Sequence, residues 1–493
     1  MTKKSKNSAA SSFVNNIFIM SSAPIVTQMI SFVLMPIIAR LYSPNLFGLF
    51  NVFASLIGPL LSFSNLGYHH AIVLPKKDQD AVVLVYGNLA ISIIVSIFIL
   101  FIVLLIPESI WFNLNIHSLR KFWWTIPVTI LLHGVNISFS GWNQRKTNYN
   151  VIAASRVLNA IVNKGYLIIF GLAGYATTGS LILGSLIGVA AMTLLQMSFF
   201  SKKTLFFSRY KEVISTLKKY KKFPLFIMSS DLVYRITSAV IFILLVSYFS
   251  ETVAGYYGMA IMITAVPSIL IGTSIGEVFY QKAATEKNAE NSNEIYIQLF
   301  SKLVKISIFP FIILAIISNE LFIIFLGAEW QQAGIYTQIL CFQMFIAFIM
   351  SPILSLAKVY NKQEYSLIEQ ILILIMSLAA IIIGGTLNNI NIAIALLSLL
   401  TGCVTLFFGL LIFYVTNVSS KKIIGIMMKY TFYCVPLVLP LVIVKSFYSS
   451  SNIGILIVGF FCFVIHYAIL LKTDKDLSSL FKNTITKLRL FNR

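Results

Sequence analysis

Long apolar runs, each about 20 residues in length, dominate the sequence and are separated by short polar or charged segments. An α-helix of that length spans the hydrocarbon core of a bilayer. Apolar and polar positions do not alternate with the two-residue period of a barrel strand. The pattern therefore predicts an all-α, polytopic membrane protein.

Windows bounded by charged residues, proline or asparagine predict about fourteen such helices. They cover roughly residues 13–39, 46–66, 81–106, 122–141, 151–173, 178–200, 224–249, 253–277, 303–326, 331–357, 365–385, 390–414, 426–446 and 453–471. The first of them follows a lysine-bearing N-terminus, as the core of a signal peptide would. It is longer than a signal core and has no convincing small-residue cleavage site, so we expect it to be retained.

The distribution of lysine and arginine tests this topology, because basic residues collect in cytoplasmic loops. With the N-terminus inside, roughly 30 of the 37 basic residues fall in inner segments. An error in the number of helices would reverse the assigned side of every later loop and remove this asymmetry. We expect an even number of spans, with the N- and C-termini both cytoplasmic. The net charge of +21 follows mostly from this topology, so no nucleic-acid partner is expected.

Composition narrows the class of protein further. The chain is 58% hydrophobic and 11% charged, which excludes a soluble enzyme, a DNA-binding protein and a disordered chain. Its four cysteines stand singly inside apolar runs, without the spacing of a metal site. We expect no metal and no bound cofactor. Outer loops are short, and no soluble segment is long enough to house an active site, so a transporter is favoured over an enzyme.

The two halves of the chain repeat each other. The segment FIMSS occurs at residues 18–22 and again at 226–230, an offset of 208 residues. Three further pairs of positions align within one residue of that offset. Phe47-Gly48 corresponds to Ala254-Gly255, Pro59 to Pro267, and Leu66-Gly67 to Ile275-Gly276. Six helices separate the copies, so both enter the membrane from the same side. This predicts two six-helix bundles related by a parallel repeat, plus two C-terminal helices.

The repeat sets the predicted domain organisation. An N-terminal six-helix lobe covers 1–200, a cytoplasmic amphipathic linker 201–223, a C-terminal six-helix lobe 224–415, and two extra helices with a basic amphipathic cytoplasmic tail 416–493. In the linker and in the tail, apolar residues recur at helical spacing among lysines. Both segments are predicted to lie on the anionic inner leaflet.

Parallel six-helix halves leave a central cavity, as in transporters that alternate access to a site between repeats. Pro59 and Pro267 are expected at matching depth in the second helix of each half. They would act as hinges that bend these helices, or as static kinks tolerated by neighbouring helices. The sequence leaves both interpretations open.

Three basic residues fall within predicted spans, where an ionisable group usually faces protein or a water-filled cavity. Lys164 and Arg235 lie about 17–20 Å from the inner ends of their helices by helical rise, close to the bilayer midplane. Arg156 precedes Lys164 by eight residues and shares its helix face, although it is also near enough to the inner end to snorkel. We assign Lys164, Arg235 and Arg156 as candidate substrate-binding residues.

Acidic residues in the spans are fewer. Asp231 precedes Arg235 by four residues and would either neutralise it as a structural pair or couple transport to an H⁺ or Na⁺ gradient. Glu277 and Glu369 are expected near inner helix ends and need no function. His133 is expected to be a satisfied core residue.

The interior charge is therefore positive, with Arg40, Arg120 and Lys121 predicted at the outer mouth. A cationic cavity in a low dielectric favours an anionic cargo such as a phosphate or pyrophosphate and repels organic cations.

Several segments carry a family resemblance. RLYSPNLFGLF at residues 40–50, NLGY at 65–68, AIVLPKKD at 71–78 and AGYY at 254–257 resemble bacterial polysaccharide flippases. These belong to the superfamily that also contains multidrug and toxic compound extrusion transporters and the lipid II flippase.

The resemblance implies translocation of an undecaprenyl-pyrophosphate-linked repeat unit of O-antigen or capsule through a cationic lumen, by rocking of two lobes. It further implies membrane lipids, a polysaccharide polymerase and a chain-length regulator as partners. No ATP-binding GxxxxGK[ST] motif is present in the sequence, so energy would come from an ion gradient or from consumption of the product. A lipid II or teichoic-type precursor flippase, an ion-coupled multidrug antiporter, and a membrane polymerase or ligase are the alternatives.

Overall fold

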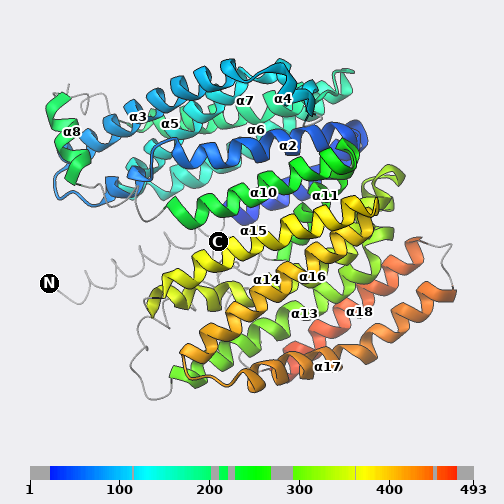
Figure 1. Cartoon of the computed structure of the whole chain (residues 1–493). Coiled ribbons are helices and arrows are strands. Elements are labelled where there is room, and N and C mark those ends of the chain that lie inside the picture. Colours follow the sequence, from blue (N-terminus) through cyan, green and yellow to red (C-terminus); the bar gives the residue numbers. More distant parts are fainter. Residues whose placement is uncertain are drawn as a thin grey trace, which may run out of the picture.

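The computed structural model describes residues 23–113, 116–200, 210–219, 228–267, 292–360, 362–447 and 452–474, with side chains for slightly fewer. Throughout these ranges the regular elements are helices, and none of the described residues forms a strand. The predicted all-α class is confirmed. The helices lie side by side in a layered bundle (Figure 1).

The first half of the chain forms the helix Ala23–Leu41, then α2 (Pro44–Phe63), α3 (Asp78–Leu105), α5 (Thr125–Arg145), α6 (Tyr149–Leu172) and α7 (Thr178–Ser198). Short elements η1 (Tyr68–Val73), α4 (Glu108–Asn113) and η2 (His117–Phe122) connect them, and α8 (Tyr210–Lys219) follows. The second half forms α10 (Met228–Tyr248), α11 (Glu251–Thr264), α13 (Ser292–Phe325), η5 (Ala328–Trp330), α14 (Gln331–Val359), α15 (Gln363–Thr386) and α16 (Ile390–Val415). The chain continues with α17 (Ser420–Phe447) and α18 (Asn452–Thr473).

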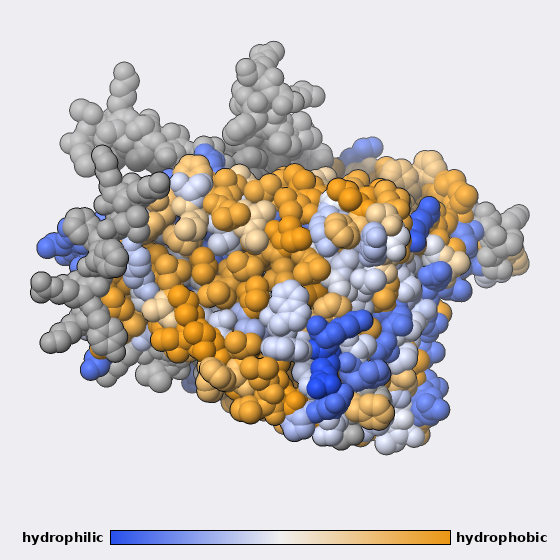
Figure 2. All heavy atoms as spheres, turned by 90° about the horizontal axis from the view of Figure 1, so that it is seen from above, coloured by the Kyte–Doolittle hydropathy of each residue, from blue (hydrophilic) through white to orange (hydrophobic). Residues whose placement is uncertain are grey.

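Most of these helices are built to cross a membrane. Ten helices among the described residues are long and apolar enough to do so. The helices α5 and α6 have sufficient length but are more polar, and they carry residues that line an internal cavity. Figure 2 shows apolar side chains over much of one face, with hydrophilic residues gathered mostly toward the ends of the helices. The protein is a multi-pass membrane protein.

The two halves meet through α2 and α11. A Cβ atom added to Gly48 would collide with the backbone carbonyl oxygen of Glu251, and one added to Gly255 with that of Pro44. Only glycine allows backbones to approach so closely. In the internal repeat, Gly48 corresponds to Gly255 and Pro44 corresponds to Glu251, so the repeat converts each of these two contacts into the other. Such an exchange is what a two-fold relation between parallel repeats requires.

Further contacts between the halves lie at the same end of the molecule, where Ala23–Leu41 and α13 end and α2, α11 and α14 begin (Figure 1, right). The Trp330 indole Nε1 donates a hydrogen bond of 2.9 Å to the carbonyl oxygen of Ala39. The Arg40 guanidinium donates one of 3.0 Å to the carbonyl oxygen of Ile324. We call this end of the molecule the packed end.

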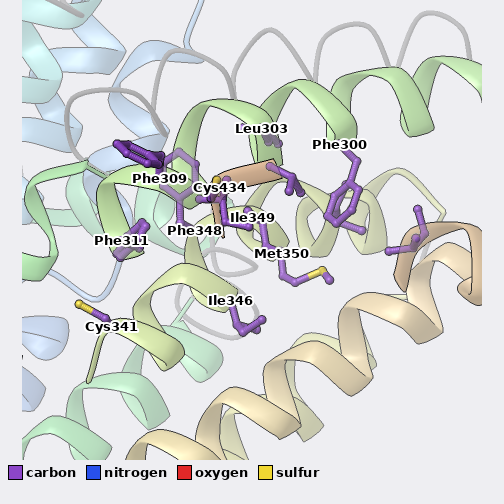
Figure 3. Packing of buried hydrophobic residues seen from close by; sticks show 14 of the residues in the cluster. Phe300, Leu303, Phe309, Phe311, Cys341, Ile346, Phe348, Ile349, Met350 and Cys434 are labelled. Atoms are coloured by element: carbon purple, nitrogen blue, oxygen red, sulfur yellow. The ribbon is translucent and has the colours of Figure 1, made fainter. Parts of the chain in front are cut away.

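The last two helices pack on the outside of the second bundle, against α13 (Figure 1). Phe309 of α13, Phe348 of α14 and Cys434 of α17 belong to one buried apolar cluster (Figure 3). An ion pair of 3.0 Å joins Lys445 of α17 to the buried Glu320 of α13. These contacts hold α17 and α18 beside the bundle while leaving their opposite faces exposed.

The linker helix α8 differs from the prediction for it. We expected its apolar face on the inner leaflet, but Val213 and Leu217 pack against Gly87 of α3. The Tyr68 hydroxyl of η1 donates a hydrogen bond of 3.2 Å to the carbonyl oxygen of Leu217. Gly87 leaves room for these side chains, so protein rather than lipid covers this part of the helix. The predicted amphipathic tail after residue 476 lies outside the described residues.

The two prolines predicted as hinges occupy different settings. Pro59 lies inside α2, which continues to Phe63. Pro267 follows a break in the helix, because α11 ends at Thr264, Ala265 forms a turn, and helical geometry resumes at Val266 and Pro267. Proline has no N–H to bond the carbonyl four residues back and disfavours helical geometry before it. The carbonyl oxygen of Ile263 accepts from the N–H of Ala265 instead.

Candidate functional site

A polar cavity of about 510 Å³ lies inside the first bundle. Four helices line it, through Pro24, Thr27 and Ser31 of Ala23–Leu41, His133 and Asn136 of α5, Arg156, Asn159, Ala160, Asn163 and Lys164 of α6, and Val189 and Met192 of α7. We call it the N-bundle cavity. Pro24 and Thr27 precede Leu41, where the helix reaches the packed end, by 14 or more residues, so the cavity extends away from the packed end.

One face of α6 provides the polar wall. Its polar residues follow one another at intervals of three, four and one positions, which places them together on one side of the helix. They are Arg156, Asn159, Asn163 and Lys164. This arrangement brings Arg156 and Lys164 to the same cavity, as their eight-residue spacing indicates. Gly188 of α7 allows the close approach of this face, because a Cβ there would collide with the Asn159 side chain.

Several polar atoms of the cavity wall lack protein partners. Nδ1 of His133, Nδ2 of Asn136 and Oδ1 of Asn163 are buried without a hydrogen bond from the described residues. Leaving such an atom unsatisfied costs about 1–3 kcal/mol. We had expected His133 to be a satisfied core residue, and one of its ring nitrogens is not. The wall is therefore suited to a polar ligand that supplies these bonds.

The charge of the wall is positive. Among the described residues, neither Arg156 nor Lys164 forms an ion pair with an acidic side chain. Other basic residues do, as Arg145 and Lys146 both bind Asp78. An arginine and a lysine that share a partly buried cavity favour an anion, and a guanidinium can bind two phosphate oxygens at once.

Arg235 approaches this region from the second half of the chain. Its Cβ lies 3.9 Å from the position that a Cβ on Gly58 of α2 would take. Arg235 thus adds positive charge beside the N-bundle cavity from α10. The side chain of Asp231, predicted to pair with Arg235, lies outside the described residues.

The three residues predicted at the outer mouth have separate roles. Arg40 bonds the second half at the packed end, as described above. Arg120 forms an ion pair with Glu108. Lys121 is exposed, with its ammonium 5.3 Å from the centre of the Phe122 ring. They do not form one cluster with the cavity residues.

A second cavity of about 680 Å³ lies inside the second bundle, between α10, α11, α14, α15 and α16. We call it the C-bundle cavity. Its wall includes Glu369, whose residue surface is only 3% exposed, and Thr405. Oε1 of Gln343 and Oε1 of Gln370, which also line the cavity, are buried without a partner in the described part of the chain.

Glu369 was expected near an inner helix end and was assigned no function from the sequence; the structure buries it in the wall of the C-bundle cavity. It lies one and a half turns into α15, inside the bundle rather than at an exposed helix end. A polar stripe at Ser366, Glu369, Gln370 and Ser377 follows the helical period and marks this face in the sequence. Among the described residues, no cluster of three histidine, cysteine or acidic side chains is present that could hold a metal ion. Glu277 lies outside the described residues.

Comparison with known proteins places the chain in a family. A model of the polysaccharide biosynthesis protein family matches residues 37–335, more than half of the chain. Among curated proteins, no sequence matches this chain significantly.

Solved structures share the fold. The chain is similar to the lipid II flippase MurJ in an inward closed conformation, with a TM-score of 0.71 and 15% identity over 92% of this chain and 99% of that one. It is also similar to an inward-facing multidrug resistance MATE family transporter of the MOP superfamily, with a TM-score of 0.61 and 15% identity over 83% of this chain and 98% of that one. Such likenesses show a common fold of two six-helix bundles. Together with the family match, they lead to the conclusion that the chain belongs to the polysaccharide biosynthesis protein family.

Proposed function

We propose that this protein is a flippase for a lipid-linked oligosaccharide. Its cargo is an undecaprenyl-pyrophosphate-linked repeat unit of a surface polysaccharide such as O-antigen or capsule, which it moves from the inner to the outer leaflet of the bacterial plasma membrane. The observation that carries the proposal is the pair of cations, Arg156 and Lys164, on an amide-rich cavity wall without an acidic partner in the described residues. Membership of a polysaccharide biosynthesis family supports the glycan part of this proposal.

The wall chemistry suits such a cargo. Guanidinium and ammonium groups bind the pyrophosphate, Arg156 through paired N–H groups and Lys164 as a point charge. Asn136, Asn159 and Asn163 offer amide donors and acceptors to sugar hydroxyls. The polyprenyl chain needs no polar partner and stays in the bilayer. Arg235 adds charge from the other bundle, so cargo binding is sensitive to how the bundles sit relative to each other.

Transport follows by alternating access. With the termini cytoplasmic, the packed end faces the outside and the N-bundle cavity receives cargo from the inner leaflet. Release then requires the Gly48–Gly255 contact and the Trp330–Ala39 hydrogen bond to open. The proline in α2 lies in one of the two helices that would have to move.

Glu369 and Asp231 are our candidates for coupling to H⁺ or Na⁺. Glu369 is a buried carboxyl group in a cavity, and Asp231 is one turn from Arg235. If Asp231 only neutralises Arg235, replacing Asp231 has no further effect once Arg235 is replaced, so the double variant Asp231→Ala/Arg235→Ala exports as much glycan as Arg235→Ala alone. Lower export by the double variant than by Arg235→Ala contradicts the neutralising role.

Glu369 also supports a second candidate function. A buried carboxylate in a cavity of about 680 Å³ suits an organic cation, so export of cationic drugs is the alternative. The cationic N-bundle cavity argues against it, because like charge repels such a cargo.

Deletion of the gene followed by mass spectrometry of extracted lipids tests the proposal. Complete polyprenyl-pyrophosphate repeat units should accumulate while surface polysaccharide disappears. Accumulation of a peptidoglycan or teichoic precursor would reassign the cargo, and single repeat units at the surface would indicate a polymerase defect. No change in either pool, with new sensitivity to cationic drugs, would favour the antiporter. A polymerase and a chain-length regulator are the proposed partners downstream.

A further inference from the structure

A groove of about 530 Å³ lies between α13, α17 and α18, on the outside of the second bundle. It is separate from both internal cavities, whose lining residues it does not share. The helices α17 and α18 pack mainly on α13, so the groove borders the region that lipid occupies (Figure 1).

The groove is polar at one end and apolar along its depth. Lys305, Lys429 and Thr473 lie at the end where α17 begins and α18 finishes. Ile308, Leu437 and Leu470 line the remainder. A lipid has this same arrangement, with a charged head group at the membrane surface and chains directed inward.

The polar end carries excess positive charge. The ammonium groups of Lys305 and Lys429 lie 5.5 and 5.9 Å from the centre of the Tyr430 ring, so one aromatic ring links both cations. Asp474 pairs with Lys305 at 2.8 Å, whereas Lys429 forms no ion pair with an acidic side chain in the described residues. One acid therefore faces two bases, which complements an anionic head group.

A buried polar atom points to a ligand as well. His466 lines the groove and is only 9% exposed, and its ring stacks on Phe309 at 4.1 Å. The stack holds the imidazole in place. Nε2 of His466 has no hydrogen-bond partner among the described residues. A glycerol or ester group below a lipid phosphate would lie at this depth.

We propose that this groove binds an anionic glycerophospholipid, with its phosphate at Lys305 and Lys429 and one acyl chain along Leu437 and Leu470. The site is separate from the cargo site, since the groove shares no lining residue with the N-bundle cavity. The lipid fastens α17 and α18 to α13 at the end opposite Lys445. Protein without the lipid should therefore be held together less firmly at this point.

Native mass spectrometry of the full-length protein in detergent, titrated with phosphatidylglycerol or phosphatidylcholine, tests this assignment. We expect phosphatidylglycerol to bind more tightly, and Lys429→Glu to weaken it about fivefold or more, the size of one lysine–lipid charge interaction. Lys472→Glu is the matched control, because it is an exposed lysine at the same end of α18 that does not line the groove. Leu470→Trp should weaken both lipids by filling the groove.

Three results would overturn the proposal. Equal losses in Lys429→Glu and Lys472→Glu would mean that binding follows general surface charge. Unchanged binding in Leu470→Trp would place the lipid elsewhere. The third result is loss of bound phosphatidylglycerol when a competitor is added. Displacement by inorganic phosphate would assign the groove to a free anion, and displacement by a polyprenyl phosphate would assign it to the cargo. The comparison of the two lipids on unaltered protein needs no variant and remains decisive if a variant folds poorly.

Discussion

The contact between Gly48 and Gly255 makes a quantitative prediction. Replacing Gly48 with alanine places a methyl group where the carbonyl oxygen of Glu251 lies, and backbone cannot move aside as a flexible side chain can. The two helices must separate, and overpacking of this kind costs about 1–3 kcal/mol. Gly255→Ala should cost a similar amount, because it meets the carbonyl oxygen of Pro44. The double variant should cost less than the sum, since one separation accommodates both methyl groups.

Thermal unfolding of the purified protein in detergent measures the effect, and Gly165→Ala is the matched control. Gly165 lies inside α6, and no atom lies within 4 Å of the position its Cβ would take. Alanine there should stabilise the helix by about 0.5–1 kcal/mol. We therefore expect melting temperatures to fall for Gly48→Ala and Gly255→Ala and to stay level or rise for Gly165→Ala. If Gly48→Ala matches the control, the close approach of α2 and α11 is wrong.

Two further substitutions test the coupling group and the packed end. Glu369→Gln removes the charge and keeps a polar side chain of nearly the same size, so it should abolish gradient-dependent transport while cargo still binds. Glu364→Gln, at an exposed site of the same helix, is the control, and equal effects of the two substitutions in a transport assay with and without a gradient would exclude Glu369. Trp330→Phe removes the hydrogen bond to Ala39, a loss of about 1 kcal/mol, so the packed end should open more often. Labelling of a cysteine placed at that end should therefore increase. Unchanged labelling would show that this bond does not hold the end closed.

Much of the architecture follows from the sequence. Apolar runs of membrane-spanning length predict the helices, and the repeat of Phe47-Gly48 as Ala254-Gly255 predicts two equivalent bundles. The repeat does not indicate that Gly48 and Gly255 approach each other's helix, because a sequence repeat says nothing about which surfaces meet. Their contact depends on how the two bundles are docked.

The site is predicted less completely. Arg156 and Lys164 share a helix face by spacing alone, and both line one cavity. The burial of Glu369 was not predicted because a charged residue near the start of a span is usually at the membrane surface, and only packing of α15 into the bundle buries it. The turn at Ala265, two residues before Pro267, has no equivalent before Pro59 in α2, and the sequence repeat does not reveal it.

Transport by purified protein tests the central claim most directly. The protein is reconstituted into vesicles with a fluorescent polyprenyl-pyrophosphate oligosaccharide, and the fraction of probe that reaches the opposite leaflet is measured by quenching with an impermeant reductant. We predict rapid exchange with the unaltered protein, loss of exchange in Lys164→Ala and in Arg156→Ala, and unaltered exchange in Lys121→Ala, whose lysine is exposed outside the cavity. Equal exchange in all three variants, or faster exchange of a cationic probe than of the pyrophosphate, would contradict the account.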